Sequence, residues 1–267
     1  MRFQQLLDSL PIVGVFVAFA IVALIASECG YRLGRWWQSR TSDNKEGPTA
    51  MIVGSLLALM GFLLAVTMSM ASDRFDKRRG LVLDEANSLG TTYLRAGYLP
   101  VPASSETRDL LREYVPLRIV ETADLAEVQV RMDRSVELHA KLWSIAEELA
   151  RTTPRSEVLA LFIVSLNETI DLHETRVTVG FGRVPETVVL LLVLGSMMTL
   201  SMVGYNAGLT LRRSPLSAVV LILVLGAVIT LVVDLDRPQG GFLKVNQQPL
   251  IDLQEQIGAL LPANPPG

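Results

Sequence analysis

Histidine and acidic side chains are the first candidates for chemistry in this sequence, because imidazole and carboxylate groups act as acid–base catalysts and as metal ligands. The chain contains only two histidines, His139 and His173. Both fall on apolar stripes of predicted helices, where a histidine is more often a core residue than a ligand. His173 does not stand at i, i+4 spacing from Glu168, Asp171 or Glu174, so the pattern does not favour a metal site. Since no nucleophile-elbow or phosphate-loop motif occurs either, we expect neither an enzyme nor a bound cofactor.

Ionisable side chains at the ends of apolar segments form the second group of candidates. Charges at or within a membrane boundary are often functional. They can equally be salt bridges that fix the ends of neighbouring helices, and the sequence leaves both interpretations open. The candidates in this group are Glu28, Asp76, Arg79, Glu85, Asp234, Asp236 and Arg237.

Four apolar segments must position these charges, and they lie at about 11–28, 50–72, 187–205 and 216–234. Each is close to the roughly 20 residues that a helix needs to cross a bilayer core about 30 Å thick. None shows the alternation of a barrel strand, so helices are the spanning structure that fits. Half of all residues are hydrophobic and the net charge is only -3, which gives no sign of nucleic-acid binding. The sequence therefore predicts an all-α protein of the lipid bilayer with four transmembrane helices.

A soluble helical insertion, residues 73–185, separates the second and third apolar segments. Apolar positions recur in it at the alternating spacings of four and three that are typical of a helix in a bundle: Leu159, Ile163, Leu166, Ile170, His173 and Val177. The tail at 236–267 carries one further amphipathic helix, QPLIDLQEQIGALL. We treat 1–267 as a single domain. An even number of spans places both termini and the insertion on one side, and the distribution of Lys and Arg favours the cytoplasm.

Small residues occupy one line along the second apolar segment. At 100° per residue, all members fall within about 40° of one line: Gly54, Ala58, Gly61, Ala65 and Ser72. Small side chains let another helix backbone approach closely, but they also leave room for a conduit. Phe62 is the single aromatic residue of this segment and lies beside the line. A hydrophobic constriction in a conduit would use such a ring.

If the helix stays regular beyond the membrane, the same line continues through Asp76, Arg79, Ala86 and Gly90. Asp76 and Arg79 are three residues apart, which is close enough to pair on a helix. They are either part of an ion-pair cluster at the membrane surface or a charged ring at the mouth of a conduit, where such rings select ions. Spacing alone does not decide between a helix packed on its neighbours and a helix that lines a path.

Several long segments resemble the bacterial bestrophin-like domain family. They extend from the second apolar segment to the tail: GFLLAVTMSMASDRFDKRRGLVLDEANSLGTTYLRAGYLP, LREYVPLR, LNETIDLHETR, VGYNAGL, DLDRPQGG and NQQPLIDLQ. The resemblance implies a relation to the bestrophins. These are pentameric ion channels whose subunits have four transmembrane helices, a helical cytosolic region inserted after the second helix, cytosolic termini and a path lined by the second helix.

The sequence departs from the bestrophin pattern in two places. Bestrophins narrow their path with a ladder of largely aromatic side chains one turn apart, whereas the turn-spaced sets here are Ala58, Phe62, Val66 and Leu59, Leu63, Thr67. Animal bestrophins hold calcium with an acidic run after the fourth helix, where this sequence has only Asp234 and Asp236.

Two hypotheses of function follow. The first is an oligomeric channel, a homopentamer of the bacterial inner membrane, that passes small inorganic ions along its second helix. The second is a non-conducting scaffold or sensor whose helical insertion binds a partner, with internal ion pairs among Asp76, Arg79, Glu85 and Arg95. A transporter would usually show broken spans in two related halves, and the sequence contains no such halves.

Overall fold

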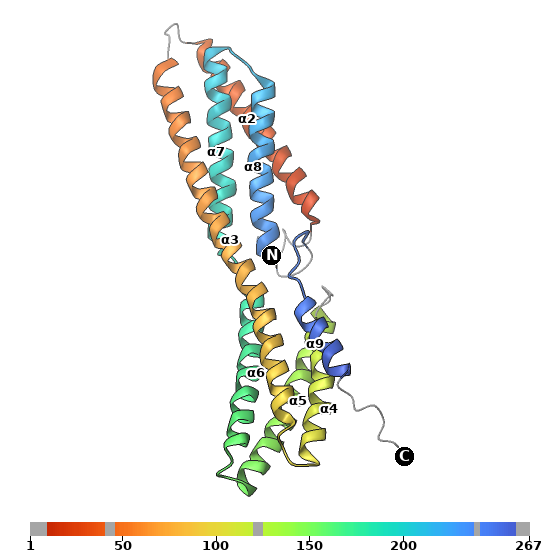
Figure 1. The fold of residues 1–267 in the computed structure, drawn as a ribbon. Coiled ribbons are helices and arrows are strands. Elements are labelled where there is room, and N and C mark those ends of the chain that lie inside the picture. Colours follow the sequence, from red (N-terminus) through yellow and green to blue (C-terminus); the bar gives the residue numbers. More distant parts are fainter. Residues whose placement is uncertain (1–9, 41–45, 120–124, 238–240, 260–267) are drawn as a thin grey trace. The chain divides into compact units, whose positions relative to one another are not determined.

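Helices make up the regular structure of the computed structural model, which describes residues 10–40, 46–119, 125–237 and 241–259, and no strand occurs in these ranges. In chain order (Figure 1) the helices are α2 (Ile12–Gln38), α3 (Glu46–Ala96), α4 (Ala103–Arg118), α5 (Leu125–Thr152), α6 (Glu157–Phe181), α7 (Glu186–Thr210), α8 (Pro215–Asp236) and α9 (Gln248–Ala259). The prediction of an all-α chain is confirmed.

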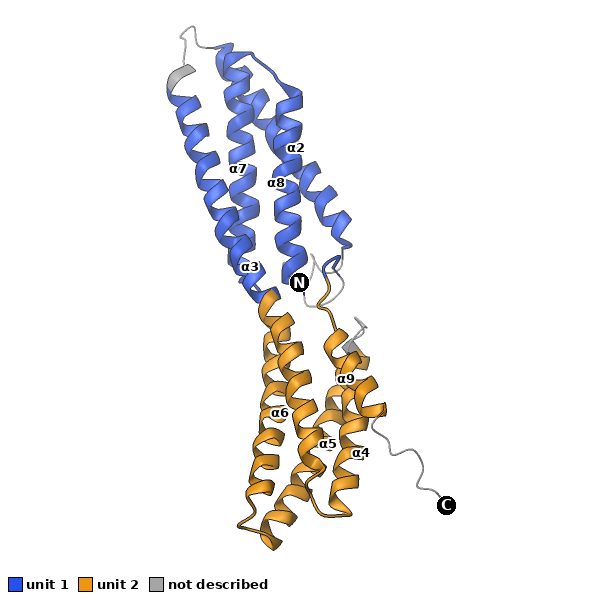
Figure 2. Cartoon of the chain, viewed as in Figure 1, with its two compact units in different colours: residues 1–75, 183–243 blue, residues 76–182, 244–267 orange. Residues whose placement is uncertain are grey.

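The chain divides into two compact units (Figure 2). Unit 1 comprises residues 1–75 and 183–243, and unit 2 comprises residues 76–182 and 244–267. Helix α3 contributes its first part to unit 1 and its second part to unit 2. Unit 1 therefore holds the apolar segments, and unit 2 holds the helical insertion together with α9.

Unit 1 contains the four transmembrane helices predicted from the sequence, since α2, α3, α7 and α8 are each long and apolar enough to cross a membrane. The helices extend beyond the apolar segments: α2 ends at Gln38 and α3 ends at Ala96. No proline falls between residues 49 and 99, so the backbone hydrogen bonding of α3 continues into polar sequence without a break. The apolar core of this unit draws on all four helices through Phe19, Ala23, Met60, Leu64, Leu192, Leu200, Ile222, Leu225 and Ile229.

Glycines bring α2 and α7 into direct backbone contact. A Cβ atom added to Gly30 would overlap the carbonyl oxygen of Ser201 on α7. In the reverse direction, Gly204 and Gly208 lie against carbonyl oxygens of α2. Small residues spaced four apart on both helices form a membrane packing motif. This pair of GxxxG patterns can be read in the sequence, although the prediction placed the small-residue surface on the second apolar segment alone.

The core of unit 2 draws on α3, α4, α5, α6 and α9. Its largest buried side chains include Leu89, Tyr93, Leu111, Tyr114, Leu138, Leu142, Phe162, Leu166 and Leu250. The predicted stripe on α6 faces this core, with Leu159, Leu166 and His173 buried. The amphipathic tail helix buries Leu253 and Ile257 as well, so helix packing in unit 2 follows the apolar periodicity of the sequence.

Candidate functional site

Helix α3 presents two different faces in unit 1. One face is buried among the other helices through Met60, Leu64, Thr67 and Ala71. The predicted line of small residues lies on the other side of the helix, where Gly54, Ala58, Gly61 and Ala65 are exposed and Ser72 is partly buried. No heavy atom lies within 4 Å of a Cβ placed on Gly54 or Gly61. Within one chain, these glycines are therefore not a packing surface for another described helix.

Phe62 lies near the centre of the exposed side of α3. Its side chain is 64% exposed, and exposed positions continue from it at helical spacing. We call these residues the uncovered face of α3: Phe62, Val66, Ser69, Asp73 and Asp76. The line of small residues runs along one border of this face, because Phe62 is displaced from Gly54 by about 80° around the helix.

The line of small residues does not remain exposed beyond the membrane. Arg79 is exposed, but Ala86 is buried, and a Cβ on Gly90 would lie 3.3 Å from a methyl carbon of Leu253 on α9. Helix α3 stays regular from Glu46 to Ala96, so the line continues along it, but in unit 2 Ala86 is buried and Gly90 is partly buried. The reason is a tertiary contact, since α9 covers this side of α3.

Asp76 and Arg79, which follow the second span, do not form the ion pair that their spacing allows. Asp76 and Arg79 are both exposed, and no ion pair joins them in the described structure. Arg95 donates a hydrogen bond from Nη1 to the carbonyl oxygen of Leu161 at 2.8 Å. The sequence suggested internal ion pairs among Asp76, Arg79, Glu85 and Arg95. Among the described residues, Glu85 is the one of these four that forms ion pairs.

The carboxylates at the end of α8 bind backbone N–H groups. Asp234 accepts hydrogen bonds from the backbone nitrogens of residues 242 and 243 at 2.9 and 3.0 Å. Asp236 accepts one from the backbone nitrogen of Val184 at 2.7 Å. Arg237 donates from Nη2 to a backbone carbonyl that precedes α2, at 2.9 Å. These contacts hold the segments that enter and leave the spans, which favours a structural role for this group.

Glu28 connects α2 with the loop that follows α7. Its carboxylate accepts hydrogen bonds from Arg32 Nε at 3.0 Å and from Arg213 Nη2 at 2.7 Å. Because Arg213 belongs to a distant part of the chain, Glu28 bridges two segments rather than stabilising its own helix alone.

Glu85 is the predicted residue that lies at the centre of a buried site in unit 2. Its carboxylate is fully buried and accepts a hydrogen bond from Arg118 Nε at 2.6 Å and another from Arg176 Nη1. Arg176 also donates from Nη2 to Gln247 Oε1 at 2.7 Å. A charge buried without a partner is strongly unfavourable. The contacts of Glu85 therefore link α3, α4, α6 and the segment before α9 into one unit.

Two histidines and a tyrosine extend this site. The Tyr114 hydroxyl lies 3.0 Å from His173 Nδ1, and the rings of His139 and His173 meet edge to face with 4.8 Å between centroids. The guanidinium of Arg118 lies over the Tyr114 ring, 5.9 Å from its centroid. Both histidines are buried in the core, as predicted. We call the whole set the buried polar site: Glu85, Tyr114, Arg118, His139, His173, Arg176 and Gln247.

Burial is the main influence on the titration of these rings. Loss of water, followed by the positive charge of Arg118, lowers the pKa of His139 to about 4 and the pKa of His173 to about 3. Burial also raises the pKa of the Tyr114 hydroxyl. All three rings are therefore neutral near pH 7, so they do not repel the two guanidinium groups beside them. Nε2 of His139 is buried and has no hydrogen-bond partner among the described residues.

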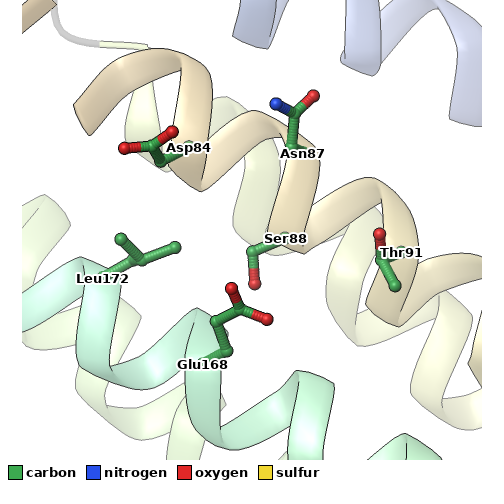
Figure 3. A pocket seen from close by; sticks show the side chains of 6 residues that line it. All are labelled: Asp84, Asn87, Ser88, Thr91, Glu168 and Leu172. Carbon is green, nitrogen blue, oxygen red and sulfur yellow. The ribbon is translucent and has the colours of Figure 1, made fainter. Parts of the chain in front are cut away.

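A polar groove lies between α3 and α6 on unit 2 (Figure 3). It has a volume of about 300 Å³ and is lined by Asp84, Asn87, Ser88, Thr91, Glu168 and Leu172. Beneath it, the buried hydroxyls of Ser88 and Thr92 each lie 3.0 Å from Thr169 Oγ1. Within the ranges that the structure describes, no three His, Cys, Asp or Glu side chains are grouped so that they could hold a metal ion.

Sequence reasoning identified Glu85 and the histidines but not the residues that bind them. Arg118 and Arg176 stand 33 and 91 residues from Glu85 along the chain, so no local spacing connects the three. A signal did exist, because the segments LREYVPLR, LNETIDLHETR and NQQPLIDLQ contain Arg118, Arg176 and Gln247, respectively. Arginines in separate segments that all carry the family resemblance could have indicated a shared site.

Comparison with known proteins agrees with this fold. A model of the bestrophin-like domain family matches residues 17–250. Two single-residue variants of a bacterial Bestrophin homolog from Klebsiella pneumoniae share 15% and 16% identity with this chain, with TM-scores of 0.65 and 0.67, over 93% of this chain and 96% of theirs. The crystal structure of a single-residue variant of a membrane protein shares 14% identity with a TM-score of 0.67, over 96% of this chain and 99% of the other. No curated protein matches the sequence.

The family match covers most of the chain, and the solved structures share the fold over nearly its full length. Their low identity means that they establish the fold and nothing finer. This chain therefore belongs to the bestrophin-like domain family and is a membrane protein with the bestrophin fold.

Proposed function

We propose that this chain is one subunit of an oligomeric channel that passes small inorganic ions, with α3 lining the path. The family relation supports this class of function, because bestrophins are ion channels. The resemblance to bestrophins also supports a homopentamer in a bacterial inner membrane. The observation that carries the proposal is the uncovered face of α3, together with the small residues along its border.

The residue types on this side of α3 differ from those on a lipid-facing helix. Helix α8 exposes large apolar side chains, among them Leu216, Val220, Leu223 and Val224. The exposed side of α3 also carries Leu59 and Val66, but glycine, alanine and serine lie between them around Phe62. Small residues in membrane helices occur where backbones approach closely, and such a surface gains little from contact with lipid chains. We infer that copies of α3 from other subunits surround a common axis on this side.

Phe62 would then face the axis once in every subunit. A ring of apolar side chains can form a constriction that gates a path by excluding water. Asp73 and Asp76 follow on the same uncovered face, where carboxylates near the membrane boundary would influence which ions enter. In this arrangement both termini and unit 2 lie in the cytoplasm. An even number of spans supports placing them on one side, and the distribution of Lys and Arg favours the cytoplasmic side.

Bilayer recordings test the proposal. The full-length protein would be purified, reconstituted and recorded across a planar bilayer as wild type and as Phe62→Ala. Removing the ring should widen the constriction, so the variant should conduct several-fold more ion current at the same voltage.

The matched control is Met198→Ala on α7, since Met198 is 71% exposed and apolar but lies on another helix. Its currents should equal those of the wild type. Verified oligomers that remain silent over a wide range of salts and voltages would overturn the channel proposal in favour of the non-conducting scaffold. Equal currents in Phe62→Ala and the wild type would remove Phe62 from the path.

A further inference from the structure

The ends of α2 and α7 form an exposed cationic surface in unit 1. The two helices finish at the same end of the unit, because Gly34 of α2 and Gly208 of α7 lie against each other close to both C-termini. Five arginines on these ends and in the following loop segments are all exposed. We call them the arginine surface: Arg32, Arg35, Arg40, Arg212 and Arg213.

Most of this positive charge has no acidic partner in the described part of the chain. Glu28 accepts hydrogen bonds from Arg32 and Arg213. The other three arginines of the surface make no ion pair with any residue that the structure describes. Among the side chains that the structure describes, one carboxylate therefore faces five guanidinium groups, and these groups carry a positive charge that would attract an anion.

Aromatic rings position two of the guanidinium groups. Arg40 lies over the ring of Trp36, 4.2 Å from its centroid, and Arg213 lies over the ring of Tyr31 at 4.7 Å. A guanidinium held by its flat face keeps its N–H edge available, and this edge matches the geometry of phosphate oxygens. Arg40 is thus oriented before a ligand arrives, whereas Arg213 already donates from Nη2 to Glu28.

The arginine surface lies at the depth of lipid headgroups. Helix α2 has 27 residues and is therefore about 40 Å long, which exceeds a bilayer core of about 30 Å. Its last turns emerge into the headgroup region, where Trp36 and Trp37 are 46% and 44% exposed. Exposed tryptophans are typical of this interface. Leu33 and Leu216 expose apolar surface at the same end, where acyl chains would lie.

We propose that the arginine surface binds the headgroup of an anionic phospholipid. The phosphate would accept paired hydrogen bonds from the guanidinium groups, and its acyl chains would pack on the exposed leucine and tryptophan side chains. The excess of positive charge selects an anionic lipid over a zwitterionic one. This binding is independent of ion conduction and therefore goes beyond the proposed channel function.

Native mass spectrometry of the full-length protein in detergent tests the proposal, with phosphatidylglycerol and phosphatidylcholine added in parallel. The informative variant is Arg35→Gln/Arg40→Gln/Arg212→Gln, because it leaves both hydrogen bonds to Glu28 intact. Each arginine near an anionic surface contributes roughly a fivefold factor in affinity. The triple variant should therefore bind phosphatidylglycerol roughly 100-fold more weakly, while its binding of phosphatidylcholine stays unchanged.

The control variant, Arg151→Gln/Arg155→Gln/Lys244→Gln, removes the same charge from exposed positions of unit 2 and should retain wild-type lipid binding. The wild type alone gives a second measurement, since added salt should weaken phosphatidylglycerol binding and not phosphatidylcholine binding. Equal binding of the two lipids by the wild type, or equal losses in both triple variants, would overturn the proposal. Competition by inorganic phosphate as effective as that by the lipid would also overturn it, because the surface would then be a simple anion site.

Discussion

Glu85 shows how one buried carboxylate can specify the packing of several helices. It lies on α3, and its partners Arg118 and Arg176 lie on α4 and α6. Burying three charges removes their favourable interaction with water. Their mutual attraction compensates for this loss only when the geometry is good and the remaining hydrogen-bond donors have partners. Gln247 satisfies part of that demand by accepting from Arg176. The buried polar site therefore favours one arrangement of unit 2 over other packings of equally apolar helices.

Replacing Glu85 with glutamine tests this role. The change keeps the shape of the side chain but leaves two guanidinium groups buried without a counter-charge, so the free energy of unfolding should fall by about 3–5 kcal/mol. Asp84→Asn, the same substitution at the neighbouring exposed position, should change it by less than about 0.5 kcal/mol. Denaturant unfolding of the full-length protein would measure both. A similar small effect in the two variants would show that the buried pairs are dispensable.

The two buried histidines predict sensitivity to acid. Their pKa values are about 4 and 3 in the folded chain, below the ordinary histidine value of about 6.5. A histidine with a lowered pKa stabilises the fold above the unfolded value and loses this contribution as the pH falls. Unit 2 should therefore lose stability progressively as the pH drops from about 6.5 toward 4.

His139→Phe should reduce this loss. Phenylalanine keeps an aromatic ring against Tyr114 and His173 but binds no proton, and it removes the unpartnered Nε2. The midpoint of thermal unfolding, measured from neutral pH to about pH 4.5, should fall less steeply for the variant than for the wild type. Parallel pH profiles would contradict a role for His139 in the acid response.

At the scale of elements, α2 and α7 differ from α3 in how they use glycine. Gly30 and Gly204 have no room for a methyl group, because each lies against a carbonyl oxygen of the facing helix. Gly61 of α3 has open space at the same position. Glycine thus allows close packing between α2 and α7, whereas in α3 it leaves a surface that no described part of the chain covers.

Alanine substitutions distinguish the two uses. Gly30→Ala should force α2 and α7 apart and lower the stability of the purified protein by roughly 1–3 kcal/mol. The same substitution at Gly61 should leave the thermal stability of a single subunit unchanged. Thermal unfolding in detergent, followed by size-exclusion chromatography, would compare them. Equal tolerance of both substitutions would show that the backbone contact of α2 and α7 is not required.

At the scale of the whole molecule, the uncovered face of α3 requires an explanation outside the single chain. Copies arranged around an axis would place the Phe62 positions of neighbouring subunits close together. A cysteine at this position should then form intersubunit disulfides after mild oxidation. Cys29 is exposed, so the experiment would use a Cys29→Ser background.

The Phe62→Cys protein should yield cross-linked dimers on a non-reducing gel, whereas Met198→Cys on α7 should remain monomeric under the same treatment. Mass photometry of the intact protein would give the number of subunits, which we expect to be five. A monomer would overturn the proposed oligomer. Efficient cross-linking at Met198→Cys alone would place α7 rather than α3 at the centre of the assembly.

The sequence predicted the fold where the physical signal is local. Apolar segments long enough to span a bilayer identified the four membrane helices, because the cost of placing polar groups in lipid acts on each residue separately. The stripe that includes Leu159, Leu166 and His173 identified the buried side of α6, since helical periodicity is a property of consecutive residues. The quoted segments identified the family, and the family match confirmed it.

Tertiary structure alone decided which partners these residues have. Helical spacing made Gly54, Gly61, Ala86 and Gly90 equivalent. Yet Ala86 is buried and α9 covers Gly90, whereas no atom of the described residues lies within 4 Å of a Cβ placed on Gly54 or Gly61. Glu85 looked like one charge among several at the membrane boundary, and its environment depends on arginines far away in the chain. Burial and charge pairing are set by contacts between distant segments, so no pattern along one helix can reveal them.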